Sequence, residues 1–278
     1  MNTATALPAS TRIAFIGGGN MASAIIGGLV RQGLPAQRIA VVEPFEGSRN
    51  SLRQRHAVEA RPAAGDFLAG AGLVVWAVKP QSFREAAAAA APHIGQAMQL
   101  SVMAGIRLGD IAAATGTDRI VRCMPNTPAL VGRGMTGLFA SSSVGAADRA
   151  LAEAVIRTTG DALWVEREAQ LDAVTALSGS GPAYVFYFLE AMQQAGVELG
   201  LSAEQARHLA VGTFAGGSAL AADSPEPLAV LRERVTSKGG TTHAALAAME
   251  QAGMKASFIE AMQAACARAR QLGDEFGR

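Results

Sequence analysis

The segment that most constrains the fold of this chain is Arg12–Ala22, RIAFIGGGNMA. Its apolar residues run directly into three consecutive glycines, and a helix-compatible segment then follows from Asn20 to about Arg31. This pattern predicts a buried parallel strand, a tight turn and the start of a helix. Free backbone N–H groups and the positive end of the helix dipole then face one point, an arrangement that binds the pyrophosphate of a dinucleotide.

Five positions in and after the glycine turn have separate expected roles. Gly17 permits the tight turn, and Gly19 lets the backbone approach the phosphates. Ala22 takes the third position of the fingerprint, where a small residue lets helix and strand pack closely. Asn20 and Met21 open the helix. We therefore take Gly17, Gly19, Asn20 and Met21 as candidate cofactor contacts.

Composition and charge exclude several classes of function. Half of the 278 residues are hydrophobic and 17% are charged, so the chain can bury a large core. A net charge of +1 and the lack of a basic run indicate no nucleic-acid or membrane partner. Residues 1–11 lack the pattern of a signal peptide and are expected to form a flexible leader. No apolar run approaches the ~20 residues of a membrane span.

Cysteine and histidine usage indicates a reducing location and no metal. Cys123 and Cys266 lie far apart in the sequence, which is typical of a cytoplasmic protein without disulfides. None of the four histidines has metal-ligand spacing. We therefore expect a cytoplasmic protein without a metal site.

The second predicted strand, residues 39–42, ends at Glu43. A dinucleotide-binding unit places a carboxylate near this position, on the adenosine ribose. A free 2′-hydroxyl donates to such a carboxylate, whereas a 2′-phosphate is repelled by it. Arg49 follows closely and can pair with a 2′-phosphate. Glu43 thus favours NAD and Arg49 favours NADP, and both residues also fit the description of ordinary exposed charges.

The apolar run at residues 73–78, LVVWAV, predicts a buried strand, and the following Lys79-Pro80 ends it. The carboxyl ends of parallel strands face the ligand crevice, so the cofactor should lie beside Ala77, Val78, Lys79 and Pro80. Lys79 is either a catalytic acid or a residue whose backbone shapes the wall of the crevice, and the second interpretation is simpler.

A later strand, predicted at residues 119–124, enters the loop Pro125-Asn126-Thr127-Pro128. Two prolines hold this loop, and its polar groups follow a strand end. We expect Asn126 to contact the nicotinamide, and the alternative is a turn that is merely bracketed by prolines.

Strands and helices alternate up to about residue 165, which requires a parallel sheet with helices on both faces. No strand-like run follows Glu166. We therefore predict an α/β dinucleotide-binding domain at residues 12–166 and an all-α domain at 167–278. Helices are expected at 20–31, 48–56, 66–70, 81–91 (closed by Pro92), 108–115, 146–159, 171–177, 183–199, 203–222, 227–235, 242–251 and 255–272, and further strands at 58–60, 98–103, 135–140 and 162–165.

The helix expected at 203–222 is rich in Ala, Gly and Ser, which lets helices pack very closely. The helical half has more apolar surface than its own residues can bury. We therefore expect its helices to pack against a second subunit, the alternative being a surface helix that is merely alanine-rich.

Two loops interrupt the helical half, SGSGP at 178–182 and SKGGTT at 237–242. Each precedes a helix and offers hydroxyls and unpaired N–H groups at its positive end, as a carboxylate ligand requires. Plain helix capping is the alternative for either loop alone, and two such loops together favour a binding site.

These segments together resemble those of pyrroline-5-carboxylate reductase, in the family's order and over nearly the whole chain. The segments are FIGGGNMA at 15–22, AVKPQ at 77–81, VRCMPNTP at 121–128, ALSGSGPAY at 176–184 and VTSKGGTT at 235–242. The resemblance implies that NAD(P)H reduces the cyclic imine Δ1-pyrroline-5-carboxylate to L-proline, the last step of proline biosynthesis. It implies NADPH as the usual cofactor, with NADH as the alternative.

The resemblance also implies a Rossmann-like domain and a C-terminal helical dimerisation domain. In such homodimers both subunits build the substrate site, and dimers often assemble into rings of five, a decamer. Two departures from the family are Lys238, where proline is common, and Gly18, often alanine. We expect Lys238 to loosen its loop and attract the substrate carboxylate, and Gly18 to matter little.

The resemblance assigns roles in the substrate site. The proposed carboxylate anchor is formed by N–H groups and hydroxyls of Gly240, Thr241 and Thr242, and Ser237 and Gly239 are further candidate substrate-binding residues. Thr242 is the candidate for a hydrogen bond to the ring nitrogen and Ser180 for lining the pocket, so these two are the candidate catalytic residues. The imine nitrogen is basic enough to bind already protonated, so no strong general acid is needed. Catalysis is then mainly positioning, which can supply roughly 7–11 kcal/mol.

Two other functions compete with this interpretation. A β-hydroxyacid dehydrogenase has the same two-domain plan but needs a catalytic lysine in a GxxxK context. Lys238 and Lys255, the lysines of the second half, lack that setting. A dinucleotide sensor would keep the first domain and lose the substrate loops, both of which are intact here by resemblance.

Overall fold

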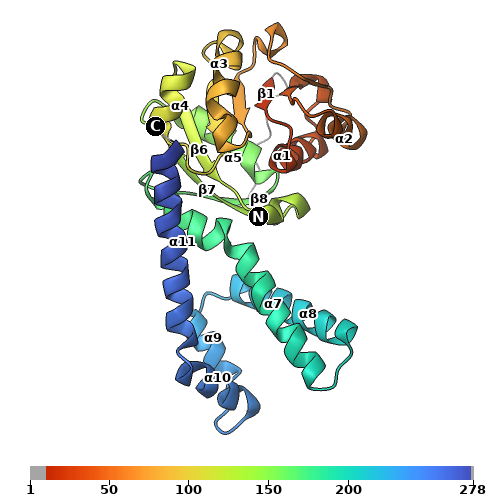
Figure 1. Cartoon of the computed structure of the whole chain (residues 1–278), viewed down its shortest axis with the longest axis vertical. Helices are drawn as coiled ribbons and strands as arrows, with labels where there is room; N and C mark the ends of the chain where they lie inside the picture. Colours follow the sequence, from red (N-terminus) through yellow and green to blue (C-terminus); the bar gives the residue numbers. More distant parts are fainter. Residues whose placement is uncertain (1–10, 277–278) are drawn as a thin grey trace. The chain divides into compact units, whose positions relative to one another are not determined.

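The computed structural model describes residues 11–276, so the leader expected at 1–11 lies almost wholly outside the described residues. These residues form two compact units (Figure 1). The first unit comprises the described residues up to Ser180 together with those from Ala265 onward, and the second is Gly181–Ala264. The boundary predicted at 166 is thus not where the contacts divide the chain, because residues 167–180 pack with the sheet.

One sheet of eight strands forms the centre of the first unit, in the order β3-β2-β1-β4-β5-β6-β7-β8. Neighbouring strands are parallel, with one exception between β6 and β7. The strands are β1 (Ile13–Ile16), β2 (Ile39–Val42), β3 (Ala60–Arg61), β4 (Leu73–Trp76), β5 (Met98–Ser101), β6 (Ile120–Met124), β7 (Gly134–Ala140) and β8 (Gly160–Trp164).

The expected parallel sheet is confirmed, with one departure at β6 and β7. These two strands are antiparallel, with Val121 opposite Ala140. Only a short 3₁₀ helix, η4 (Thr127–Val131), lies between them. Because a parallel pair needs a crossover of a dozen or more residues, this short connection returns the chain antiparallel. The next connection contains the helix α5 (Ala146–Arg157), and β8 is again parallel to β7.

The two faces of the sheet carry separate hydrophobic cores, because successive strand residues point to opposite sides. On β1, Ile13 and Phe15 belong to one core, and Ala14 and Ile16 to the other. The first core also contains residues of α1 (Asn20–Arg31), α2 (Glu46–His56) and α5, and the second contains residues of α3 (Phe83–Ile94) and α4 (Leu108–Thr115). The predicted cover of helices on both faces is confirmed.

The prediction that Pro92 closes the helix after residue 91 is wrong. Helix α3 continues through Pro92 to Ile94, and Gly95 follows with φ of 53°. Proline within the last turn removes only one hydrogen bond of the ladder, which the packed helix tolerates here. Gly95, whose positive φ is favoured by glycine, ends the helix instead.

The second unit consists of helices: α7 (Gly181–Glu198), α8 (Ala203–Asp223), α9 (Leu228–Arg234), α10 (Thr241–Gln251) and the first part of α11 (Met254–Phe276). Phe258 of α11 makes edge-to-face contacts with Tyr184 and Phe188 of α7, with ring centroids 5.6 Å apart in both pairs. Helices α7 and α8 approach so closely that a Cβ on Gly196 would lie 2.7 Å from Cβ of Ala206.

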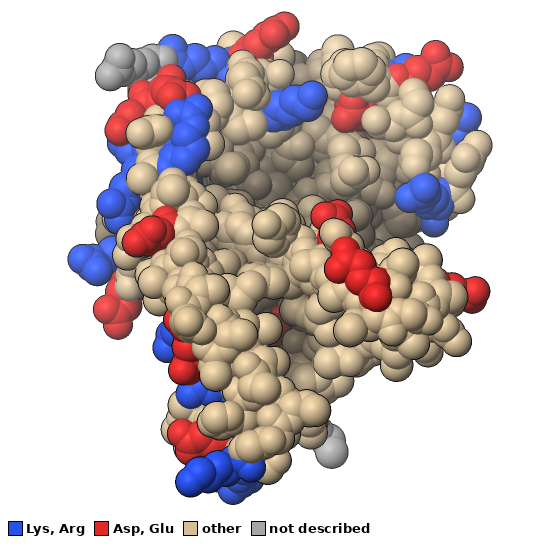
Figure 2. All heavy atoms as spheres, turned by 60° about the horizontal axis from the view of Figure 1, so that its bottom comes forward, with Lys and Arg blue, Asp and Glu red and all other residues tan. Residues whose placement is uncertain are grey.

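Few side chains of this second unit are buried. Helices α7, α9 and α10 contain no buried residue, and α8 buries only Ala206 and Ala210. Its large exposed apolar residues are Val185, Phe186, Tyr187, Met192, Val197, Leu199, Leu201, Leu209, Val211, Leu220, Leu228, Val235, Met249, Met254 and Ile259. On the face of the molecule in Figure 2, uncharged side chains predominate and charged ones form small groups. The small-residue helices therefore present apolar surface rather than a filled core.

Candidate functional site

The carboxyl ends of β1, β2 and β4 meet at Gly17. Its N–H donates to the carbonyl of Val42 at 2.8 Å, and the N–H of Ala77 donates to the carbonyl of Ile16 at 2.8 Å. Gly17 has φ of 101°, and a Cβ there would lie 2.5 Å from the carbonyl oxygen of Ala77. Only glycine fits this conformation and this approach. The predicted tight turn is present, and Ala77 lies directly against it.

Gly19 has a different role, which requires open space around its Cα so that a ligand can approach the backbone. It is the N-cap residue of α1, with φ of −69° and no side chain to cap the helix. Nothing lies within 4 Å of a Cβ built on it. The first N–H groups of a helix have no intrahelical partner, and here Asn20 is exposed and Met21 half-buried at that point. The residues present therefore fit the pyrophosphate of a dinucleotide.

Glu43 is not an ordinary exposed charge. Its side chain turns back to the glycine turn, and the residue is only 6% exposed. One carboxylate oxygen accepts the N–H of Gly18 at 2.7 Å, and the other accepts that of Phe45 at 2.8 Å. Each carboxylate oxygen can accept a second hydrogen bond. Glu43 thus brings a negative charge to the wall of the glycine turn.

Gly18, which we expect to matter little, is tightly packed in this chain. A Cβ on Gly18 would lie 3.0 Å from Cβ of Glu43 and 2.8 Å from Cδ1 of Leu52. Both neighbours would have to shift to admit the alanine that is common in the family. Gly18 therefore makes room for the buried Glu43 side chain.

Arg49, the second candidate at the adenosine end, is half-buried on α2. Its Nη1 donates to the carbonyl oxygens of Glu43 at 3.0 Å and Pro44 at 2.5 Å. These bonds hold the guanidinium at the end of β2, beside the backbone of Glu43. The structure thus brings both cofactor candidates to one strand end.

The segment after β4 begins beside the glycine turn, where Ala77 and Val78 approach Gly17. Val78 and Pro80 are half-buried, whereas Lys79 is exposed. Lys79 immediately precedes the short 3₁₀ helix η3 (Pro80–Ser82). An exposed ammonium agrees with the simpler interpretation, in which the backbone of Lys79 shapes the wall.

Asn126 lies at the end of β6, two strands from β4, which corresponds to about 10 Å along the strand ends. Its Nδ2 donates to the carbonyl oxygen of Ser178 at 3.2 Å and to Oγ of Ser178 at 3.1 Å. Its Oδ1 accepts the N–H of Met135 at 2.9 Å. The side chain that we expect to contact the nicotinamide is thus engaged with two other segments of the protein.

The loop expected at 178–182 is helical instead. Helix α6 (Gln170–Val174) continues into a π-helical turn at Thr175–Gly179, and α7 begins at Gly181. The N–H of Ser180 donates to the carbonyl of Thr175 at 2.8 Å, five residues back. Glycine and proline in SGSGP indicate a loop, but an i→i+5 turn also accommodates them. Such turns occur often at functional sites.

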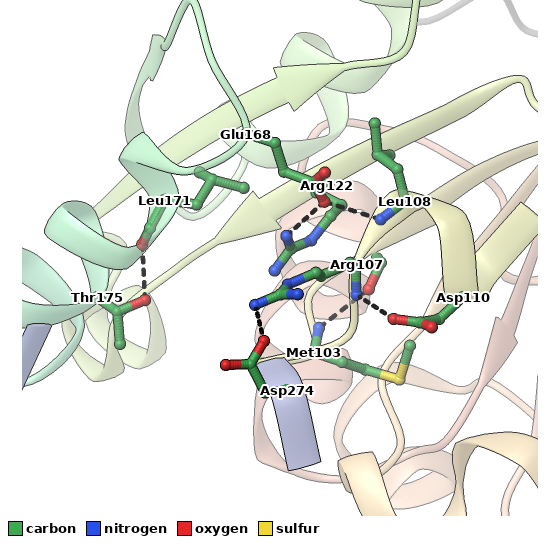
Figure 3. Close-up of polar contacts among 10 residues, drawn as sticks. Met103, Arg107, Leu108, Asp110, Arg122, Glu168, Leu171, Thr175 and Asp274 are labelled. Carbon is green, nitrogen blue, oxygen red and sulfur yellow. Dashed lines mark hydrogen bonds and ion pairs between the residues drawn. The ribbon is translucent and has the colours of Figure 1, made fainter. Parts of the chain in front are cut away.

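Sequence reasoning missed a charged cluster at the amino end of α6 (Figure 3). Arg122 of β6 donates to Oε1 of Glu168 at 2.6 Å, and the N–H of Leu108 donates to the same oxygen at 2.8 Å. The side chain of Arg122 is only 9% exposed. An arginine within the otherwise apolar strand IVRCM is the signal that could have indicated it.

Two groups near this cluster have shifted pKa values. Burial raises the pKa of Asp172, more than the nearby Arg122, Arg270 and Arg107 lower it. Burial also raises the pKa of the Cys123 thiol, although Arg122 opposes the shift. A thiol that stays protonated is a poor nucleophile, so Cys123 belongs to the core.

The second candidate segment, residues 237–242, lies in the second unit and joins α9 to α10. Gly240 is the N-cap residue of α10, and its carbonyl accepts the N–H of Ala244 at 3.1 Å. Ser237 and Gly239 are exposed, as is Thr241, while Thr242 is half-buried in the first turn. The first N–H groups of α10 have no carbonyl partner within the helix. The segment thus keeps the donors that a carboxylate needs.

Two kinds of site are not found among the described residues. No helix of residues 11–276 is both long enough and apolar enough to cross a membrane. Within the same part of the chain, no three His, Cys, Asp or Glu side chains are grouped so that they could hold a metal ion.

A parallel sheet with a glycine turn after β1 and polar groups at the following strand ends defines a dinucleotide-dependent oxidoreductase. Family models agree: residues 12–105 match the NADP oxidoreductase, coenzyme F420-dependent family, and residues 168–272 match pyrroline-5-carboxylate reductase dimerisation. The second match also indicates that the protein forms an oligomer.

Individual proteins are similar over nearly the whole chain. The pyrroline-5-carboxylate reductase of Pseudomonas aeruginosa is 42% identical over 96% of this chain and 98% of that protein. The structure of the Coxiella burnetii reductase matches with a TM-score of 0.88 at 36% identity, covering 95% of this chain and 98% of that one. The Plasmodium falciparum reductase with NADP bound matches with a TM-score of 0.84 at 26% identity, covering 95% and 99%. The chain belongs to the pyrroline-5-carboxylate reductase family.

Proposed function

We propose that this chain reduces Δ1-pyrroline-5-carboxylate to L-proline at a site assembled from the residues described above. It is an NAD(P)H-dependent reductase of its family, and the reaction is the last step of proline biosynthesis. This family assignment favours the imine reductase over a β-hydroxyacid dehydrogenase and over a dinucleotide sensor. The observation that supports the reaction most directly is that family models match both parts of the chain. One model matches the cofactor-binding part at residues 12–105, and the other matches the dimerisation part at residues 168–272.

The cofactor half of the proposal rests on the glycine turn. Gly17 forms the tight turn, its N–H being engaged by Val42. Gly19, Asn20 and Met21 hold the pyrophosphate through backbone N–H groups, and residues 77–80 line the crevice wall. Glu43 and Arg49 lie at the adenosine end. When bound, the reduced nicotinamide supplies a hydride.

The substrate half of the proposal rests on the first turn of α10. Ser237, Gly239, Gly240 and Thr241 anchor the substrate carboxylate through N–H and hydroxyl groups. The hydroxyl of Thr242 accepts a hydrogen bond from the ring nitrogen, and Ser180 lines the pocket. The substrate binds as the protonated iminium ion, so addition of hydride to its C=N carbon yields the amine directly. The residues then act by orientation, and no side chain has to deliver a proton.

The proposal includes assembly and location. The helical half forms a homodimer, dimers join into a decamer, and each substrate site draws on two subunits. The fifteen large apolar residues exposed on the second unit support an interface between subunits. The free cysteines Cys123 and Cys266 are consistent with a cytoplasmic location.

The reaction is tested by following NAD(P)H oxidation at 340 nm with pyrroline-5-carboxylate, beside NAD(P)⁺ reduction with a 3-hydroxy acid. Turnover of the imine alone is expected. Turnover of the hydroxy acid alone would support the dehydrogenase, and turnover of neither would support the sensor.

Thr242→Ala tests the substrate half. Loss of one hydrogen bond to the reacting ring is expected to lower kcat/KM by about a hundredfold, with cofactor affinity near normal. Thr242→Ser keeps the hydroxyl and should recover most of the activity. Thr236→Ala is a matched control, because its hydroxyl already donates to the carbonyl of Arg232 at 2.6 Å. Equal activity of Thr242→Ala and the wild type would remove Thr242 from the mechanism.

The cofactor preference is tested with the same assay. Glu43→Gln keeps an oxygen that can accept the N–H of Gly18 but removes the charge, so the ratio of NADPH to NADH efficiency is expected to rise. Glu46→Gln, at an exposed position on α2, is the control. An unchanged ratio would show that Glu43 does not contact the adenosine end.

A further inference from the structure

Strand β6 and its loop contact the segment 168–180 at both ends. Arg122, within β6, holds Glu168 at the start of the segment. Asn126, just after β6, holds Ser178 near its end. Between these ends, Oγ1 of Thr175 donates to the carbonyl of Leu171 at 2.7 Å (Figure 3). The segment that ends in Ser180 is therefore fixed relative to one strand end.

The amide of Asn126 has one orientation that satisfies all its neighbours. The backbone N–H of Met135 requires an acceptor, so Oδ1 faces Met135. The carbonyl of Ser178 requires a donor, so Nδ2 faces Ser178. Oγ of Ser178 in turn donates to the carbonyl of Met135 at 3.3 Å. These bonds close a ring among three segments: the loop after β6, the start of β7 and the π-helical turn.

Close packing also joins the π-helical turn to the end of β6. A Cβ on Gly179 would lie 2.6 Å from Cε of Met124, the last residue of β6. Glycine at this position lets the π-helical turn lie against the strand end. Polar and apolar contacts thus hold residues 178–180 at the edge of the sheet where β6 ends.

We propose that Asn126 is a positioning residue, which holds the π-helical turn so that Ser180 faces the reacting ring, and that it does not itself contact the nicotinamide. This inference rests on the proposed function for the role of Ser180. It replaces our expectation from the sequence that Asn126 is a cofactor contact. The two roles differ in what is lost on substitution: a contact residue affects cofactor affinity, whereas a positioning residue affects the turn and the use of the imine.

The first test is Asn126→Ala in the full-length protein, with three measurements. Hydrogen exchange of the Ser180 amide, which donates to Thr175, is expected to become faster. The value of kcat/KM for pyrroline-5-carboxylate is expected to fall by about tenfold or more. A small displacement of Ser180 from the reacting ring is enough to slow the reaction. The Kd for NADPH, from fluorescence titration, should stay within about twofold of the wild type.

Two other variants separate positioning from a general loss of stability. Gly179→Val displaces the turn from Met124 without changing Asn126, and it should reproduce all three results. Glu153→Ala is the control for stability alone. Glu153 also joins a helix to a strand, accepting from Nε1 of Trp164 on β8 at 2.9 Å, but it lies on α5. It should lower the Tm without changing the exchange of Ser180 or the kinetics.

Each other result would overturn the proposal. A rise in the NADPH Kd that matches the loss of kcat/KM, with Ser180 exchange unchanged, would mean that Asn126 contacts the cofactor. Faster exchange with unchanged kinetics would mean that the position of the turn does not matter. The exchange and Kd measurements require no turnover, so they still decide the proposal if the wild type fails to reduce the imine.

Discussion

The two compact units of this chain bury their side chains very differently. The first unit has a hydrophobic core on each face of its sheet, built from fully buried residues such as Phe15, Trp76 and Phe83. Among the helices of the second unit, only Ala206 and Ala210 of α8 are buried, and large apolar residues are exposed along their length. The hydrophobic effect can therefore stabilise the first unit within one chain, but it favours the second only when another surface covers it.

This difference has a consequence for the proposed site. The glycine turn, the strand ends and the Asn126–Ser178 contacts all lie in the first unit, which one chain can complete. The segment 237–242 lies in the unit that depends on covering its apolar helices. We infer that cofactor binding is a property of the single chain, whereas substrate anchoring depends on assembly.

The largest expected effect comes from breaking the association directly. Leu209 and Val211 of α8 are 56% and 43% exposed. Because about half of each side chain is already buried, Leu209→Asp with Val211→Asp would remove about 1.5–3 kcal/mol of apolar burial per subunit from an interface. We expect light scattering at micromolar concentration to show a monomer, with activity lost and NADPH binding retained.

Leu163→Asp provides the control for this variant, since Leu163 is 43% exposed on β8 in the first unit. It should leave the mass unchanged. If the wild type itself has the monomer mass, or the double variant keeps the oligomer, the contrast between the units is wrong.

The next effect concerns the first unit alone. Gly17→Ala would place a Cβ 2.5 Å from the carbonyl oxygen of Ala77 at φ of 101°, so we expect a loss of several degrees in Tm and no cofactor binding. Gly19→Ala meets no atom within 4 Å and should fold normally, yet bind NADPH weakly because the methyl group occupies the approach to the phosphates. Calorimetry and fluorescence titration distinguish the two. Equal Tm values for the two variants would contradict the view that Gly17 is required for the turn and Gly19 only for the approach of the phosphates.

A smaller effect is expected from the part-buried ion pair of the first unit. Arg122→Ala removes the ion-pair partner of Glu168, whose side chain is 29% exposed. The loss of stability should therefore be about 2 kcal/mol, below that of a fully buried pair. Urea denaturation should show this loss. The double variant Arg122→Met with Glu168→Leu should recover much of it, because neither charge then remains. A double variant that is less stable than Arg122→Ala would show that the pair itself is strongly stabilising.

The smallest expected effect is a pH dependence of the Tm. A substitution in the first unit should change it, and one in the second unit should not. Burial raises the pKa of Asp172, so the folded state favours the protonated form, and the stability from this group is lost as pH rises. Asp172→Asn should therefore increase the Tm at neutral pH, by at most about 2 °C given solvent screening, and the gain should vanish on acidification toward the ordinary value of 3.8. Asp223→Asn, at an exposed position in the second unit, should change the Tm at neither pH.

Local patterns in the sequence predicted most of the elements correctly. Helices α1 and α4 have the predicted bounds, because apolar spacing and glycine stops mark both ends. Strands β1 and β2 are likewise where apolar runs meet turn residues. The conformation of Gly17 was also predictable, since it depends on the chain within a few residues.

Other features depend on contacts between residues far apart in sequence. The sequence does not show which distant residue a polar side chain will bond. The contacts of Arg122 with Glu168 and of Asn126 with Ser178 were therefore found only in the folded structure. The antiparallel pairing of β6 and β7 followed from the shortness of their connection, which the alternation pattern does not express. Helix α3 passes through Pro92 because packing outweighs the loss of one hydrogen bond.

The sequence by itself determined the dinucleotide-binding class, the all-helical second half and the family, because each depends on motifs that are local and ordered along the chain. Only the tertiary structure decided what Glu43, Gly18 and Asn126 do. Burial turns Glu43 toward the N–H of Gly18 and Asn126 toward Ser178, and burial is a property of the packed chain. Residue identity sets which hydrogen bonds a group can form, and packing selects those that it does form.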